Sequence, residues 1–195
     1  MKYSEFLEKT SFTKEELIAF AYGRLVDDPP AEFSRLPAPP FLMMDRVLEI
    51  QNNGKRGRIV GEKDIQIDEW FFQCHFNGDP VQPGCLGVDA VWQLLGFYCV
   101  CAGSEGNGRA LGSKEINFDG QIRPYNKLVR YEIDIKRYSI IQEGEVSIVI
   151  GDAKIFVDNE LIYTMNSAKV GIFKGIAYDD YPNPSKNSVG GLIKR

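Results

Sequence analysis

One histidine and one aspartate are the side chains of this sequence that point most directly to acid–base chemistry. His75 is the only histidine among the 195 residues. Asp89 is the only charged side chain between Pro80 and Ser104, a stretch otherwise rich in Leu, Val, Phe and Tyr. An imidazole can take a proton near neutral pH, and a carboxyl group kept neutral by apolar surroundings can give one. The pair therefore indicates a general base and a general acid.

The residues around Asp89 predict a long buried helix that begins near Gly84. Apolar residues surround Asp89 on every side of a 3.6-residue period, which is typical of a core helix. An ionised carboxylate is costly to bury without a partner, so we expect Asp89 to be protonated, hydrogen-bonded or open to a cavity. Two prolines make residues 78–84 a rigid loop. Free N–H groups at the helix start, near Gly84 and Cys85, could hold a developing oxyanion.

Composition excludes several classes of protein. The chain is 44% hydrophobic and 26% charged, which is typical of one soluble globular domain. A net charge of −4 disfavours nucleic acid as a partner. Asp89 and Gln93 argue against a membrane span through the apolar stretch. Because no secretory signal is visible, we expect a cytoplasmic protein, and nothing in the sequence calls for a cofactor.

Four cysteines, Cys74, Cys85, Cys99 and Cys101, all lie near the two candidate catalytic residues. They form no C-x-x-C pair, and without a secretory signal we expect them to be reduced. A zinc site at Cys74, His75 and Cys85 is disfavoured because adjacent ligands rarely converge on one ion. We therefore predict no metal, and we interpret Cys74 and Cys85 as small buried hydrophobic residues.

The order of the remaining elements predicts an α+β fold. Thr13 opens a T-x-x-E capping box, which indicates a helix that ends before Pro29. Apolar patterns and turn residues predict strands over residues 41–50, 56–67, 109–118, 128–138, 143–157 and 161–173. One long helix followed by consecutive antiparallel strands predicts a curved sheet wrapped around that helix. We expect a helical arm (1–35), a main domain (36–173) and a flexible tail (174–195).

The segment from Cys74 to Gln93, which reads CHFNGDPVQPGCLGVDAVWQ, resembles the active-site motif of the bacterial 3-hydroxydecanoyl-acyl carrier protein dehydratase/isomerase family. The resemblance continues through LPAP (36–39), LMMDR (42–46), GRALG (108–112), LIY (161–163) and KVG (169–171), and it covers about residues 11–173. It implies the hot-dog fold, in which an antiparallel sheet wraps a long helix. It also implies a homodimer with its active sites at the subunit interface.

The resemblance assigns a role to each matching residue. It implies that His75 takes a proton from C2 of a 3-hydroxyacyl thioester and that Asp89 of the other subunit is the acid. The N–H of Gly84 would bind the thioester carbonyl, and the carbonyl of Val81 would hold the second imidazole nitrogen. The residues implied to contact the substrate are Gly84, Cys85, Val81, Phe76 and Gln93.

The implied substrate is a 3-hydroxyacyl chain on the phosphopantetheine of an acyl carrier protein, in fatty acid biosynthesis. Asp89 favours the bifunctional branch, which also converts trans-2 to cis-3 enoyl chains, because related dehydratases without isomerase activity usually carry Glu there. Lys136, Arg137 and Lys169 are the cations expected to dock the carrier. Two departures bear on chain length and docking: Gln82 replaces the usual methionine, and residues 140–143 lack the family's arginines.

Three other interpretations stay open. A hot-dog thioesterase would use Asp89 to activate water on the same carbonyl, and a dehydratase without isomerase activity would stop at the trans-2 product. A non-catalytic acyl-binding paralogue would need neither His75 nor Asp89. On their own, a lone histidine beside an apolar helix is more often a core residue, and Arg109 and the three docking cations would form an ordinary solvated face.

Overall fold

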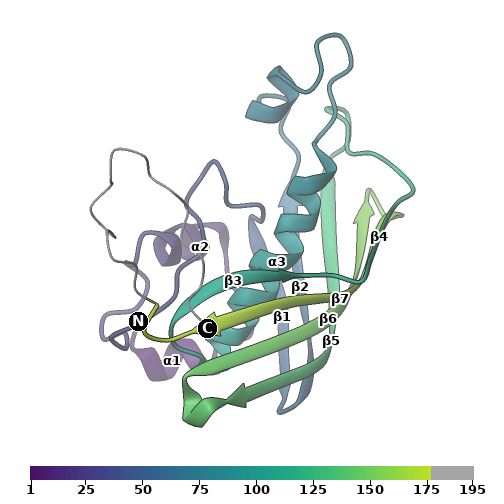
Figure 1. Cartoon of the computed structure of the whole chain (residues 1–195). Coiled ribbons are helices and arrows are strands. Elements are labelled where there is room, and N and C mark those ends of the chain that lie inside the picture. The colour runs from purple at the N-terminus through teal and green to yellow at the C-terminus, as the bar shows by residue number, and fades with distance from the viewer. Residues whose placement is uncertain (177–195) are drawn as a thin grey trace, which may run out of the picture.

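A curved antiparallel sheet wraps around one long helix (Figure 1). The computed structural model describes residues 1–176. The sheet has seven strands in the order β1-β2-β5-β6-β7-β3, and β4 pairs with β7 beside β3. The helices are α1 (Tyr3–Glu8), α2 (Lys14–Ala21) and α3 (Gly84–Cys101), with 3-10 turns η1 (Trp70–Gln73) and η2 (Gln142–Gly144). The strands are β1 (Arg46–Asn53), β2 (Arg56–Asp64), β3 (Asn107–Gly112), β4 (Glu115–Phe118), β5 (Leu128–Ile141), β6 (Val146–Val157) and β7 (Glu160–Phe173).

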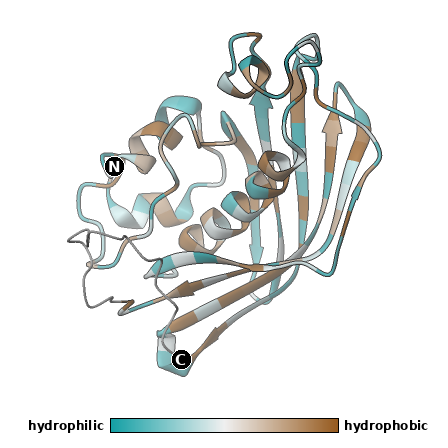
Figure 2. Ribbon diagram, turned by 45° about the horizontal axis from the view of Figure 1, so that its top comes forward, coloured by the Kyte–Doolittle hydropathy of each residue, from teal (hydrophilic) through white to brown (hydrophobic). Residues whose placement is uncertain are grey.

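Helix α3 is the core of the protein, as its apolar sequence predicts. Leu94 and Leu95 are fully buried, and two sheet glycines let the helix lie close to the strands. A Cβ on Gly61 would lie 2.8 Å from Leu94, and one on Gly151 would lie 3.2 Å from Leu95. The strands alternate between hydrophobic and hydrophilic residues along their length (Figure 2). The sheet thus presents one apolar face to the helix.

The length and composition of α3 would also suit a membrane span. However, 72% of its apolar window is buried inside the protein. Strands β5, β6 and β7 all contact it. The apolar character of α3 is therefore explained by its packing against the sheet of the same chain.

The N-terminal arm packs against α3 through aromatic rings. The predicted capping box is confirmed, because the Thr13 hydroxyl accepts from the N–H of Glu16 at 3.3 Å and the Thr13 N–H donates to the Glu16 carboxylate at 2.9 Å. The ring of Phe97 on α3 meets Phe12 edge-on at 4.9 Å and Phe20 at 5.1 Å. These contacts place the arm over one end of the helix.

The prediction of a strand over residues 41–50 is wrong in its first half, because β1 begins at Arg46. The side chain of Gln93 forms hydrogen bonds with backbone groups that a strand would use to pair with a neighbouring strand. Its amide nitrogen donates to the Phe41 carbonyl at 2.9 Å, and its oxygen accepts from the Met43 N–H at 3.0 Å. A side chain from α3 therefore replaces strand pairing here.

Several further boundaries differ from the predictions, and β5 continues to Ile141 rather than ending at residue 138. Residues 109–118 form two strands, because the pairing with β7 shifts at Gly112, which has a φ of +120°. Strand β6 begins at Val146 rather than at residue 143, because Gln142 and Glu143 adopt positive φ in the turn η2. Strand β2 ends at Asp64 rather than at residue 67. The predicted tail lies outside the described residues from 177 onward. The α+β hot-dog fold itself is confirmed.

Candidate active site

His75 lies on a tight loop between η1 and α3. The loop closes on itself, because Phe76 and Asp79 exchange backbone hydrogen bonds of 2.9 and 3.0 Å. The N–H of His75 donates to the carbonyl of Phe71 at 2.9 Å, and the N–H of Val81 donates to the carbonyl of His75 at 2.8 Å. The backbone of the histidine is therefore fixed on both sides.

The imidazole of His75 is fixed as well. Its Nδ1 atom lies 2.9 Å from the carbonyl oxygen of Val81. A carbonyl oxygen can only accept a hydrogen bond, so Nδ1 carries the proton in the neutral ring and Nε2 keeps a free lone pair. The ring of Phe76 packs on the imidazole at a centroid distance of 3.8 Å. This arrangement presents Nε2 as a base.

His75 opens into a cavity of about 740 Å³ that also reaches the start of α3. Gly84 and Cys85, the first two residues of the helix, line this cavity. First-turn N–H groups have no acceptor within their helix, so they can bind an oxygen atom in the cavity. A Cβ on Gly84 would lie 2.7 Å from the ring of Phe118, so a larger residue here would have to displace that ring.

Asp89 lies one turn into α3 and is half-buried. Its carboxylate accepts from the amide of Gln93 at 2.6 Å, and the same amide binds the Phe41 carbonyl. Burial raises the pKa of Asp89 above its ordinary value of 3.8, and the hydrogen bond from Gln93 opposes part of that rise. The sequence expectation that this carboxyl is hydrogen-bonded or open to a cavity is confirmed on both counts.

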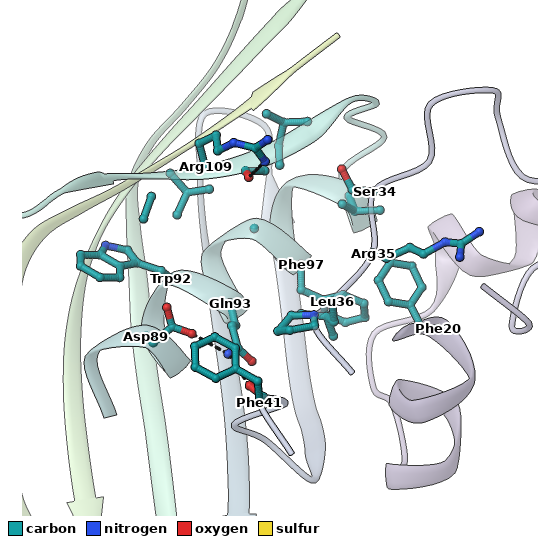
Figure 3. A pocket seen from close by; sticks show the side chains of 17 residues that line it. Phe20, Ser34, Arg35, Leu36, Phe41, Asp89, Trp92, Gln93, Phe97 and Arg109 are labelled. Carbon is teal, nitrogen blue, oxygen red and sulfur yellow. Dashed lines mark hydrogen bonds between the residues drawn. The ribbon is translucent and has the colours of Figure 1, made fainter. Parts of the chain in front are cut away.

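Asp89 lines a second cavity, of about 210 Å³ (Figure 3). It is not among the residues that line the cavity of His75. Gln93, Phe41 and Arg109 line the same space. Trp92 lines both cavities, so it stands between the base and the acid of one chain. Within residues 1–176, His75 and Asp89 of one subunit therefore line two different cavities.

The other residues implied at the substrate take different places. Val81, Gly84 and Cys85 line the cavity of His75, whereas Gln93 lines the cavity of Asp89. Phe76 is 55% exposed beside the imidazole. The interpretation of Cys74 and Cys85 as buried residues is wrong, because both are exposed. Cys85 is exposed because the first turn of α3 faces the cavity rather than the core.

The structure adds three residues to which the sequence assigns no role at the site. Phe118 and Tyr163 line the cavity of His75 and meet edge-on at 4.7 Å, and Trp92 lines both cavities. The family resemblance includes Trp92 and Tyr163 in its motifs, but no local signal connects Tyr163 to a histidine far away in the chain. Within residues 1–176, no group of three His, Cys, Asp or Glu side chains could hold a metal ion.

The three cations predicted to dock a carrier protein lie on adjacent strands. Arg137 on β5 is paired with Ile150 on β6, which is paired with Lys169 on β7. Directly paired residues share a face of the sheet, so Arg137 and Lys169 flank Ile150 in one row. Lys136 differs, because Asp152 forms an ion pair with it at 3.0 Å.

A curved antiparallel sheet wraps one long helix, and a histidine and a carboxyl group line cavities beside that helix. These features are those of an enzyme of the hot-dog class. The chain belongs to the FabA-like domain family, whose model matches residues 36–166, more than half of the sequence.

Several solved structures are similar to the chain. The dehydratase heterocomplex ApeI:P from Xenorhabdus doucetiae is 11% identical, with 71% of this chain and 86% of that chain covered and a TM-score of 0.48. A hypothetical thioesterase with coenzyme A from Streptococcus pneumoniae is 12% identical, with coverages of 65% and 82% and a TM-score of 0.42. The MaoC-like dehydratase from Rhodospirillum rubrum is 15% identical, with coverages of 64% and 94% and a TM-score of 0.38.

The raised pKa of Asp89 predicts how its loss changes stability with pH. The folded state holds the Asp89 proton above pH 3.8, where the unfolded chain has released it, so the wild type loses stability as pH rises through that range. Asp89→Asn removes this loss. We expect its stability relative to the wild type to increase from about pH 4 to about pH 7, by at most about 1 kcal/mol because water screens the half-exposed carboxyl. Urea unfolding at matched protein concentration measures this difference, and a difference that does not change with pH would contradict the prediction.

Proposed function

We propose that this protein is a 3-hydroxyacyl-[acyl-carrier-protein] dehydratase. The single observation that carries the proposal is the hydrogen bond of 2.9 Å between His75 Nδ1 and the Val81 carbonyl, in a cavity that includes the start of α3. It leaves Nε2 as a base next to N–H groups that can hold an enolate oxygen. Membership of the FabA-like family supports the same chemistry.

The proposed reaction is the removal of water from C2 and C3 of the acyl chain. His75 Nε2 takes the C2 proton while the Gly84 N–H stabilises the negative charge on the thioester oxygen. The electron pair forms the C2–C3 double bond as the C3–O bond breaks. Asp89 gives its proton to the departing hydroxyl, which leaves as water, and the proton on His75 later returns through solvent to regenerate the acid. A neutral carboxyl suits this role, and burial of Asp89 favours the neutral form.

We further propose that the enzyme isomerises part of its product. With the trans-2 enoyl chain still bound, His75 could take a proton from C4 and return it to C2, which moves the double bond to C3. This needs only the base already assigned, and the aspartate at position 89 favours it. The pathway would be fatty acid biosynthesis in the cytoplasm.

The active site is proposed to form between two subunits. His75 and Asp89 line separate cavities within one chain, with Trp92 between them, so the carboxyl nearest His75 would come from a second copy. Two apolar side chains at the cavity of His75 would otherwise face water: Phe118, which lines it, is 52% exposed, and Phe76, which packs on the imidazole, is 55% exposed. Strand β3 is also an edge of the sheet and could pair with its copy.

The reaction is tested with a 3-hydroxydecanoyl thioester and mass spectrometry of the products. We expect loss of water in the wild type, and a fall in rate of about 10²–10⁴ in Asp89→Asn and in His75→Ala, because each removes one proton-transfer group. The double variant should be little slower than either single one, since the two groups act as a unit. Near-normal dehydration by Asp89→Asn would refute the assigned acid. Release of free thiol without dehydration would instead identify a thioesterase.

Mixing two inactive variants tests the shared site. A dimer formed from His75→Ala and Asp89→Asn chains contains one active site with both catalytic residues intact and one with neither. We therefore expect activity to return on mixing, up to about a quarter of the wild-type rate if chains exchange at random. Each variant refolded alone is the control. Full activity in a monomeric fraction during sedimentation would overturn the interface site.

Docking of the carrier is proposed at Arg137 and Lys169, with Lys136 contributing less because Asp152 already neutralises it. Acyl carrier proteins are acidic, so Arg137→Glu should raise KM for carrier-linked substrate several-fold and leave KM for a short pantetheine substrate almost unchanged. Arg24→Glu makes the same charge change on the N-terminal arm and should affect neither. Equal effects of Arg137→Glu on both substrates would rule out docking at this row.

A further inference from the structure

A second segment of the chain, residues 120–126 after β4, holds the loop of His75 at two points. The N–H of Gln82 donates to the carbonyl oxygen of Ile122 at 2.9 Å. The Arg123 guanidinium donates to the carbonyl oxygen of Pro80 at 3.2 Å, and it forms an ion pair with the carboxylate of Asp79. The hydrogen bonds to Pro80 and Gln82 fall on the residues immediately before and after Val81.

The two contacts fix both peptide units of Val81. Each peptide unit is planar, so a hydrogen bond at one end orients the group at the other end. The Gln82 N–H shares its plane with the Val81 carbonyl, which lies 2.9 Å from His75 Nδ1. The Pro80 carbonyl shares its plane with the Val81 N–H, which donates to the backbone carbonyl of His75 at 2.8 Å. Because both peptide planes are fixed in orientation, both hydrogen bonds between Val81 and His75 are fixed as well.

Arg123 is itself tied to the sheet. Its N–H donates to the side chain of Asn126 at 2.7 Å, and the Asn126 amide donates to Asp158 at 2.9 Å in the turn between β6 and β7. Asp158 also accepts from the N–H groups of Lys127 and Leu128, each at 3.0 Å. A continuous series of hydrogen bonds thus connects the end of the sheet to the loop of His75.

We propose that Arg123 is a positioning residue for His75. It keeps the peptides of Val81 in place, so that Nδ1 holds its proton against the Val81 carbonyl and Nε2 stays free as the base. Arg123 does not line the cavity of His75, so it acts through the loop and not on the substrate. The catalytic use of His75 rests on the proposed function, whereas the orientation of its ring does not.

The test replaces Arg123 by leucine, which keeps aliphatic bulk and removes the guanidinium. Because His75 is the only histidine, its two ring nitrogens can be read directly in a long-range nitrogen–proton NMR spectrum. We expect the wild type to show the neutral ring with Nδ1 protonated and Arg123→Leu to show a mixture of both tautomers. With 3-hydroxydecanoyl thioester, kcat should fall about tenfold or more, because a small misplacement of a reacting group is costly. KM should change less than about twofold, because no substrate contact is lost.

Two further variants separate positioning from a general loss of stability. Arg123→Lys can still reach Asp79 or Pro80, so it should recover part of both the tautomer signal and kcat. Arg58→Leu removes an arginine of similar exposure (31% against 25%) whose ion pairs lie within the sheet, at Glu132 and Asp134. It should lower stability without changing the tautomer or kcat.

The proposal is overturned if Arg123→Leu keeps the wild-type tautomer, or if Arg58→Leu changes the ring nitrogens to the same extent. If Arg123→Leu does not fold, Asp79→Asn removes only the charge that Arg123 holds, and it should shift the tautomer in the same direction. An unchanged ring in folded Asp79→Asn would then contradict the proposal. Absence of dehydration in the wild type would refute the proposed function alone, because the nitrogen signals do not depend on activity.

Discussion

Burial of α3 inside the curved sheet is the constraint on which the rest of the structure depends. An apolar helix of this length cannot face water, and the sheet and the N-terminal arm together cover it. Every polar group on the helix must then find a partner or a cavity. Gln93 and Asp89 meet this requirement together, since the amide of Gln93 binds the carboxylate as well as the Phe41 and Met43 backbone. The packing of one helix thus sets the surroundings of the candidate acid.

The candidate base is held in a different way. His75 lies on a loop, where backbone groups are free to bond to one another and to the neighbouring segment. Hydrogen bonds with Phe71 and Val81 fix its backbone and its ring, and the 120–126 segment in turn holds the peptide units of Val81. Desolvation in a helix therefore raises the pKa of the candidate acid, whereas hydrogen bonds in a loop set the orientation of the candidate base.

The errors in the predicted strands have physical causes that a sequence pattern does not contain. Residues 41–45 are apolar enough for a strand. However, Gln93, about fifty residues later in the chain, forms hydrogen bonds with backbone groups of this segment. Residues 109–118 are predicted as one strand, but their pairing with β7 shifts at Gly112. In both places a distant segment decided between local structures that the sequence alone left equally good.

The sequence by itself determined the elements whose signals are local: the capping box at Thr13, the apolar helix from Gly84, the long alternating strand β5, and a histidine and an aspartate close together in the chain. Propensity, periodicity and capping depend on neighbours within a few residues, so they can be read from one chain. Tertiary structure decided that His75 and Asp89 line separate cavities, with Trp92 between them. It also decided that Arg123 reaches the loop of His75. These facts depend on contacts between segments far apart in the chain, and only the curved sheet folded around α3 fixes those distances.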